Sequence, residues 1–195
     1  MYHLYAIKIP KSENLYDIYA KYSEIGILAE LWAGMTKKQE ETDGYGVRRM
    51  ILISECLAGV PCRMDGKSKL IPEIKKLADS GLAVCACPEV LGGLPTPREP
   101  SERCGNRVIN RAGDDVTEAF QKGAEEALRI YREHNCTMAV LKSKSPSCGI
   151  GMIHNGLFDG GLVPGNGVCA QLFLDEGIEV ITEQEYLRRN AEEKA

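Results

Sequence analysis

The sequence has no long apolar run and no excess of positive charge. None of its 195 residues lie in a stretch approaching the roughly 20 consecutive apolar residues that span a bilayer. Lys and Arg number 24 against 28 Asp and Glu, giving a net charge of −4, whereas proteins that bind long nucleic acids usually carry a basic face. We therefore expect neither a membrane nor a long nucleic acid as partner, while a free base or nucleoside remains compatible with this charge.

A secretory signal is also missing from the first residues. The opening MYHLYAIKIPKSENLY has neither the charged start and apolar run nor the small-residue cleavage site of a signal peptide. We therefore expect the chain in the cytosol. Its eight cysteines are too sparse for a small disulfide scaffold. In a reducing compartment they indicate metal ligands or catalytic thiols.

Cysteine is absent from the first 49 residues, and this absence marks a boundary. The same segment holds the only tryptophan, Trp32, and six of the eight tyrosines, and it ends in a polar stretch at 36–49. Two interpretations remain: residues 1–49 are a helical appendage, or they extend the reading frame upstream of a native start at Met50. We favour the second, and we expect the domain at 50–195 to carry the chemistry.

From Met50 onward, apolar runs suited to buried strands alternate with amphipathic stretches. Strands are expected at 50–55, 82–86, 137–142 and 178–181, and helices at 69–80, 115–134, 167–176 and 183–193. This alternation predicts an α/β domain whose mostly parallel sheet is covered by helices on both faces.

Three cysteines lie at or shortly after the ends of three of the expected strands. Cys56 comes after the first, Cys87 after the second, and Cys148 in the loop after the third. Ligands of open α/β sheets bind beyond the carboxyl ends of the strands, so we expect these thiols at one edge of the sheet. A structural zinc takes four ligands, which Cys62 would complete. An iron–sulfur cluster held by only three thiolates would instead leave one iron open as a Lewis acid.

The loops around these cysteines carry recognisable motifs. The runs ILISECLAGVPCRMDG, CPEVLGGLPTPREPSE and LKSKSPSCGIG occur in this order. They resemble the thiouracil desulfidase family, long catalogued as a domain of unknown function, from Met50 to about Tyr186. Residues 1–49 have no counterpart in the family core, and Met64 stands where an aromatic residue is common.

The resemblance implies a Rossmann-like three-layer fold and a [4Fe–4S] cluster held by Cys56, Cys87 and Cys148. It also implies the non-redox conversion of a thiocarbonyl to a carbonyl, with release of sulfide. The substrate would be a small thiolated pyrimidine such as thiouracil, and the cluster-assembly machinery would be a partner. Family membership alone does not fix the substrate.

Four further residues are candidates for the site. Glu89 and Ser145 match family positions beside the cluster that suit acid–base work and substrate contact. Arg98 suits a substrate carbonyl or phosphate, and Cys62 a thiol on the substrate side of the cluster. The alternatives are structural: Glu89 pairs with Arg98, Ser145 stabilises the turn before Pro146, and Cys62 is a cluster ligand or a packing residue.

Two other functions remain open on the sequence. One is a binding protein with a closed four-cysteine site that includes Cys62, for structure, zinc storage or sensing. The other is a redox enzyme without a cluster that uses a pair of Cys56 and Cys62. Of the remaining cysteines, we expect Cys85, Cys136 and Cys169 in the core and Cys104 in a polar loop.

Overall fold

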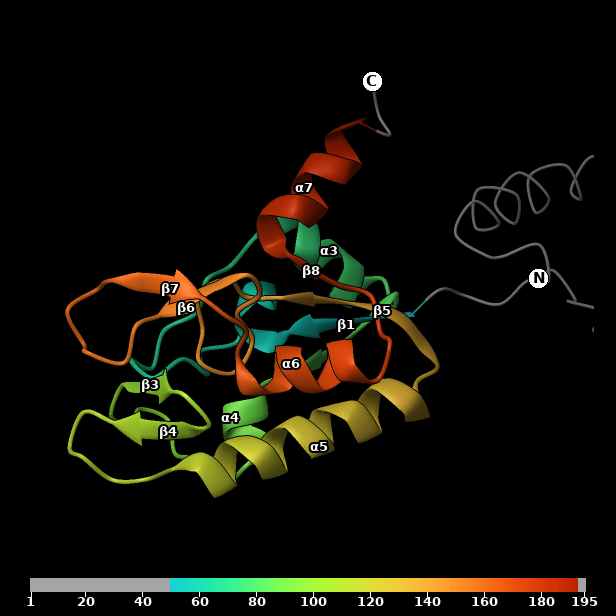
Figure 1. Ribbon diagram of the computed structural model, residues 1–195. Coiled ribbons are helices and arrows are strands. Elements are labelled where there is room, and N and C mark those ends of the chain that lie inside the picture. The colour runs from blue at the N-terminus through green and yellow to red at the C-terminus, as the bar shows by residue number, and fades with distance from the viewer. Residues whose placement is uncertain (1–49, 193–195) are drawn as a thin grey trace, which may run out of the picture. The chain divides into compact units, whose positions relative to one another are not determined.

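Four short apolar runs form one parallel sheet (Figure 1). The computed structural model describes residues 50–192, so both interpretations of residues 1–49 lie outside the described residues. The strands pair in the order β2-β1-β5-β8, and all three pairings are parallel. Their bounds are β1 (Met50–Ser54), β2 (Ala83–Ala86), β5 (Cys136–Leu141) and β8 (Val180–Thr182). The expected strands are therefore present, with ends that differ by at most two residues.

Helices cover both faces of this sheet, as Figure 1 shows. Alternate side chains of each strand point to opposite faces, and the buried residues accordingly form two clusters. In one cluster, Leu52 and Ala139 pack with residues of α5 (Thr117–Glu133) and α6 (Val168–Asp175). In the other, Ile53 and Val140 pack with residues of α3 (Pro72–Asp79) and α7 (Glu183–Glu192). The predicted three-layer α/β arrangement is thereby confirmed.

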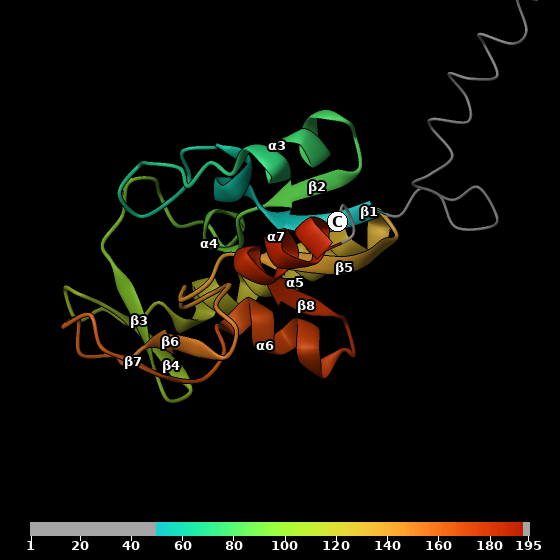
Figure 2. The same ribbon diagram turned by 90° about the horizontal axis from the view of Figure 1, so that it is seen from above.

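Several short elements were not expected from the sequence. A 3-10 turn, η1 (Glu55–Ala58), follows β1, and the one-turn helix α4 (Pro88–Leu91) follows β2. Two antiparallel hairpins, β3 (Ser101–Cys104) with β4 (Arg107–Asn110) and β6 (Met152–His154) with β7 (Leu162–Pro164), lie side by side in Figures 1 and 2. Their strands have only three or four residues, which is too short for a periodic pattern of apolar side chains to reveal them.

The cysteines outside the motifs lie where the sequence placed them, with one difference. Cys136 and Cys169 are buried in the core, as expected. Cys85 is half-buried and packs against the core cluster around Ile53. Cys104 is exposed, but it ends strand β3 and is not in an irregular loop. Among residues 50–192, no helix has the length and apolar character needed to cross a membrane.

Candidate functional site

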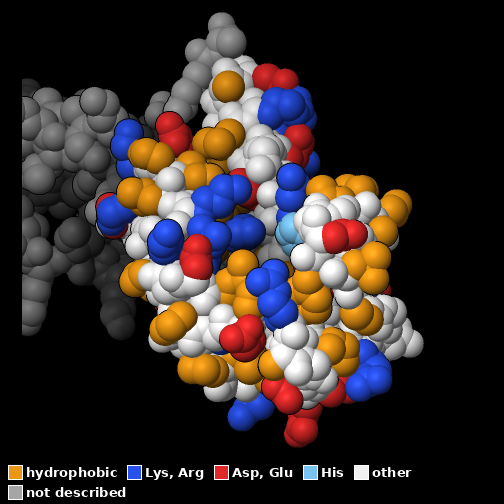
Figure 3. Space-filling model, turned by 90° about the vertical axis from the view of Figure 1, so that its left-hand side faces the viewer, with side chains coloured by type: hydrophobic (Ala, Val, Ile, Leu, Met, Phe, Trp, Pro, Cys, Tyr) orange, Lys and Arg blue, Asp and Glu red, His pale blue; other side chains and the backbone are white. Residues whose placement is uncertain are grey.

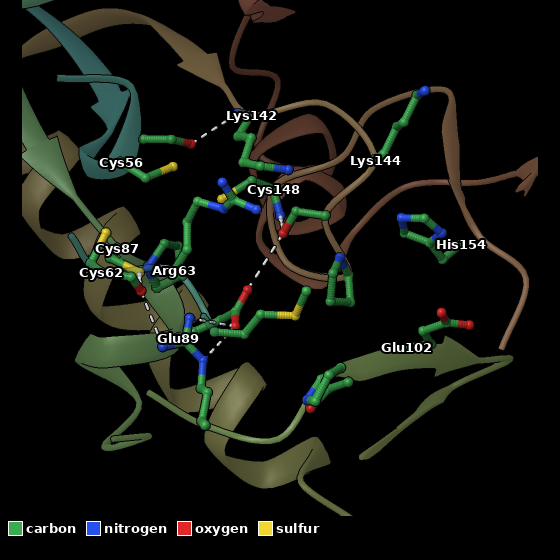
Figure 4. Close-up of a pocket in the computed structure, with 18 of the residues that line it drawn as sticks. Cys56, Cys62, Arg63, Cys87, Glu89, Glu102, Lys142, Lys144, Cys148 and His154 are labelled. Atoms are coloured by element: carbon green, nitrogen blue, oxygen red, sulfur yellow. Dashed lines mark hydrogen bonds and ion pairs between the residues drawn. The ribbon is translucent and has the colours of Figure 1, made fainter. Parts of the chain in front are cut away.

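A cavity of about 260 Å³ lies beyond the carboxyl ends of β1, β2 and β5 (Figure 4). Every site residue inferred from the sequence lines it: Cys56, Cys62, Cys87, Glu89, Arg98, Ser145 and Cys148. The carboxyl ends of neighbouring parallel strands share one edge of the sheet, and this edge is where such folds bind ligands. The sheet topology thus explains why side chains far apart in sequence meet here.

Each of the three strand-end cysteines is held by a different local structure. Cys56 lies in η1 directly after β1, and this turn ends at Gly59, whose φ of 100° is costly for other residues. Cys87 is extended, with φ −112°, and Pro88 begins α4 immediately after it. Cys148 is buried in a turn behind β5. The three sulfurs therefore reach the cavity from three separate segments.

Close packing of α4 on α5 fixes the position of the Cys87 segment. Gly92 of the α4 cap and Gly123 of α5 face each other's backbones. A Cβ atom on Gly123 would lie 1.8 Å from the carbonyl oxygen of Pro88, and one on Gly92 would lie 1.9 Å from that of Ala119. Only glycine allows this approach, which holds α4 and the residues before it against the core.

Cys62 lies between two of these thiols and changes their acidity. It is 5% exposed, and its carbonyl oxygen accepts a long hydrogen bond of 3.8 Å from the Cys87 thiol. Hydrogen bonding with the Cys62 thiol lowers the pKa of Cys56 and lowers that of Cys87 to about 7. The same hydrogen bonds raise the pKa of Cys62. Thiolates bind metals, so Cys56 and Cys87 are the readier donors of this group.

Burial has the opposite effect on Cys148. Desolvation raises the pKa of its thiol well above the usual value, and a hydrogen bond with Ser54 opposes this only partly. A thiol of this kind becomes a thiolate when a metal replaces its proton.

The arrangement of the thiols bears on the kind of metal group they could bind. Within residues 50–192, no three or more His, Cys, Asp or Glu side chains converge in a way that would hold a single metal ion. The thiolate ligands of a four-iron cluster bind different irons and need not converge on one point. Three thiols that face a shared cavity therefore fit a cluster.

Glu89 and Arg98 form an ion pair inside the cavity. Nε and Nη2 of Arg98 lie 2.8 and 2.7 Å from Oε2 of Glu89, and the two side chains are only 6% and 15% exposed. Nη1 of Arg98 donates to the carbonyl oxygens of Cys62 and Pro95, both at 3.1 Å. Every nitrogen of the guanidinium group therefore has a protein partner, and the pairing considered as an alternative from the sequence is present.

Ser145 connects Glu89 to the Cys148 turn. Its Oγ accepts hydrogen bonds from the backbone N–H groups of Ser147 and Cys148, both at 3.1 Å. The same hydroxyl lies 3.5 Å from Oε1 of Glu89, to which it donates. Ser145 therefore stabilises its turn, which was the structural alternative, and also lies within reach of the carboxylate.

Both the sequence and the fold have known relatives. Residues 51–185 match the family described as 2-thiouracil desulfurase. The chain belongs to this family. Two relatives add detail. The uncharacterized protein YbbK of Bacillus subtilis (strain 168) is 43% identical over 146 residues, which cover 70% of this chain and 97% of that protein. The solved structure of the [4Fe-4S]-dependent thiouracil desulfidase TudS is 44% identical, with a TM-score of 0.68 over 71% of this chain and 93% of that one.

These matches confirm the family and the Rossmann-like fold inferred from the three motifs. The match to the family covers residues 51–185, close to the range over which the motifs resemble it.

The cavity also contains residues that sequence reasoning missed. Arg111 and Phe158 line it but were not proposed from the sequence, because they lie outside the three family motifs and next to strands that were not expected. His154, at the end of β6, also lines it. Lys142, Lys144 and Glu102 lie within the motifs, and their charge was the signal that could have identified them.

Positive charge predominates around the opening. Figure 3 shows Lys and Arg side chains gathered on this face, with a His side chain beside them. Arg63 lines the cavity and pairs with Asp65 at 3.3 Å.

Proposed function

We propose that this chain is a [4Fe–4S]-dependent desulfidase that converts the C=S group of a thiolated pyrimidine such as thiouracil to C=O. Water supplies the oxygen and sulfide leaves, so the reaction needs no electron donor or acceptor. One observation carries the proposal. Cys56, Cys87 and Cys148 line a single cavity in a chain that is 44% identical to a [4Fe-4S]-dependent thiouracil desulfidase.

In this proposal, Cys56, Cys87 and Cys148 hold the cluster. Their support is the chemistry of the donors, since cysteine thiolates are the usual ligands of iron–sulfur clusters, and Cys56 and Cys87 have a lowered pKa. A cluster with three protein ligands would supply one open iron as a Lewis acid for the substrate's sulfur. Cys62 would remain a free thiol that faces the substrate.

Glu89 is the proposed acid–base group. Its Oε2 is occupied by Arg98, whereas within residues 50–192 Oε1 has only the longer contact with Ser145. Oε1 is therefore the atom that would take a proton from the attacking water or pass one to the ring nitrogen. Groups in such roles typically contribute about 10²–10⁴-fold to the rate.

Arg98 and Ser145 would act by different routes. The donors of Arg98 are directed to protein acceptors, so it would influence the substrate by holding Glu89, and not by direct contact. Ser145 would contact the substrate or relay a proton through its hydroxyl, because it lies between Glu89 and the Cys148 turn.

The setting of the enzyme is also part of the proposal. All eight cysteines are free, as suits a cytosolic protein that receives its cluster from the assembly machinery.

We further propose that the domain from Met50 is sufficient for function. A chain that begins at Met50 should fold, bind iron and turn over thiouracil; its failure to do so would make residues 1–49 part of the functional unit.

Anaerobic purification tests the function. The protein should be brown, contain about four irons per chain and convert thiouracil to uracil, and removal of the iron by a chelator should abolish conversion. A colourless protein that contains zinc, or conversion that persists after the metal has been removed, would contradict the proposal.

A further inference from the structure

The loop between β6 and β7, residues 155–161, is held in one conformation by its own side chains. The side-chain oxygen of Asn155 accepts from the Leu157 N–H at 2.9 Å. Oδ1 of Asp159 accepts from the Gly161 N–H at 2.7 Å and from the Asn155 amide at 2.9 Å. A loop with this many internal bonds presents its remaining side chains in fixed directions.

Glu102 fixes the same loop from outside. This β3 residue is only 7% exposed, and its Oε2 accepts from the backbone N–H groups of Gly156 at 2.8 Å and Phe158 at 3.1 Å. Phe158 is held at φ 56°, a left-handed conformation that is uncommon for a bulky residue. Surrounding structure has to maintain such a conformation, and Glu102 does so through one hydrogen bond from Phe158 itself and one from Gly156.

Phe158 therefore forms an aromatic part of the cavity wall. Phe158 lines the cavity together with Arg111, whose Cζ lies 5.4 Å from the centre of the Phe158 ring, within the range of a cation–π contact. Figure 4 places Glu102 and His154 at the end of the cavity away from Cys56, Cys62 and Cys87. Because Glu102 binds the backbone of Phe158, the aromatic side chain belongs to this far end.

Resting on the proposed function, we propose that Phe158 is a specificity-determining residue that stacks on the planar ring of the substrate. A pyrimidine whose sulfur points to the thiol end of the cavity turns its ring toward this wall. Aromatic side chains bind flat heterocycles by stacking, with little dependence on their substituents. Glu102 is the positioning residue, acting on the substrate through Phe158. The site therefore selects planar thiolated rings over saturated ones.

Binding of uracil, the sulfur-free product, tests the stacking without depending on turnover. Calorimetry on the anaerobic holoenzyme should give a Kd for Phe158→Leu about tenfold or more above that of the wild type. Phe158→Tyr, which keeps the ring, should stay within about twofold, as should Leu157→Ala. Leu157 is a matched control because it neighbours Phe158 but is 71% exposed and outside the cavity lining. Dihydrouracil, whose ring is puckered, should bind almost equally to the wild type and to Phe158→Leu.

Glu102 variants separate positioning from direct contact. Glu102→Ala should weaken uracil binding as much as Phe158→Leu does, whereas Glu102→Gln should restore it, because an amide oxygen can accept the same two backbone bonds. A Gln variant as weak as the Ala variant would overturn the positioning role. Unchanged uracil binding by Phe158→Leu, in an enzyme that still converts thiouracil, would overturn the stacking alone. A wild type that neither binds uracil nor converts thiouracil would overturn the proposed function and this inference with it.

Discussion

Arg98 directs two nitrogens at the same carboxylate oxygen of Glu89, at 2.7 and 2.8 Å, inside the cavity. In the part of the chain that the structure describes, the other oxygen of Glu89 has only the 3.5 Å contact with Ser145. One half of the carboxylate is thus a structural anchor, and the other half is available for chemistry. We propose that this asymmetry keeps one oxygen of Glu89 ready for proton transfer.

Replacing Glu89 by Gln tests its proton-transfer role. The amide keeps the size of the side chain and still accepts a hydrogen bond from Arg98, but it cannot take up a proton. We expect a normal brown cluster, near-normal substrate binding and a kcat about a hundredfold lower or more. Turnover of thiouracil close to that of the wild type would assign the proton transfer elsewhere, with Ser145 and Cys62 the next residues to test.

Replacing Arg98 by Lys separates positioning from substrate contact. A lysine keeps the charge but cannot donate from both Nε and Nη2 while also reaching the Cys62 carbonyl. If Arg98 acts through Glu89, kcat should fall by about tenfold while KM and iron content stay close to the wild-type values. A rise in KM with an unchanged kcat would instead make Arg98 a direct contact of the substrate.

The positions of the cysteines predict which cysteine variants lose their iron and which keep it. Cys56→Ala, Cys87→Ala and Cys148→Ala should each lose most of the bound iron, because two thiolates remain for the cluster. Cys136→Ala and Cys169→Ala should keep it, with some loss of stability from the cavity left in the core. Iron analysis of the five purified variants checks this, and a normal iron content in any of the first three would remove that residue from the ligand set.

The close packing of Gly123 against Pro88 predicts that a larger side chain at position 123 lowers the stability of the fold. In Gly123→Ala the new methyl group would overlap the Pro88 carbonyl, where the Cβ position is only 1.8 Å from the oxygen. Helix α4 has to shift, and we expect a loss of about 1–3 kcal/mol in the free energy of unfolding. Lys122→Ala, at an exposed position of the same helix, is the matched control and should change stability by less than about 0.5 kcal/mol. Equal denaturation midpoints for the two variants would refute the close packing as a constraint.

The sequence predicted the sheet and the thiol end of the cavity because both depend on buried strands. Apolar runs are readable without tertiary information. Cys56 and Cys87 follow such runs directly, and Cys148 lies in the loop after a third. Glu89 was identified together with its possible partner Arg98, although only the structure shows that they pair.

The far end of the cavity was not predictable in the same way. The position of Phe158 at this end depends on three features: its left-handed backbone conformation, the three-residue strand β6 before it, and the two hydrogen bonds from its loop to Glu102. None of these leaves a periodic pattern in the sequence. Arg111 and His154 are isolated charged or polar residues, and only the pairing of the hairpins brings them to the cavity.

The most direct test of the account is the product balance of a reaction without any reductant or oxidant. The anaerobic holoenzyme is mixed with thiouracil in ¹⁸O-labelled water, and uracil and sulfide are both quantified. The account predicts uracil and sulfide in equal amounts, with one labelled oxygen in the uracil and no net change in the redox state of the iron. Uracil formation that requires an added electron donor or acceptor, or that leaves the label out of the product, would contradict it.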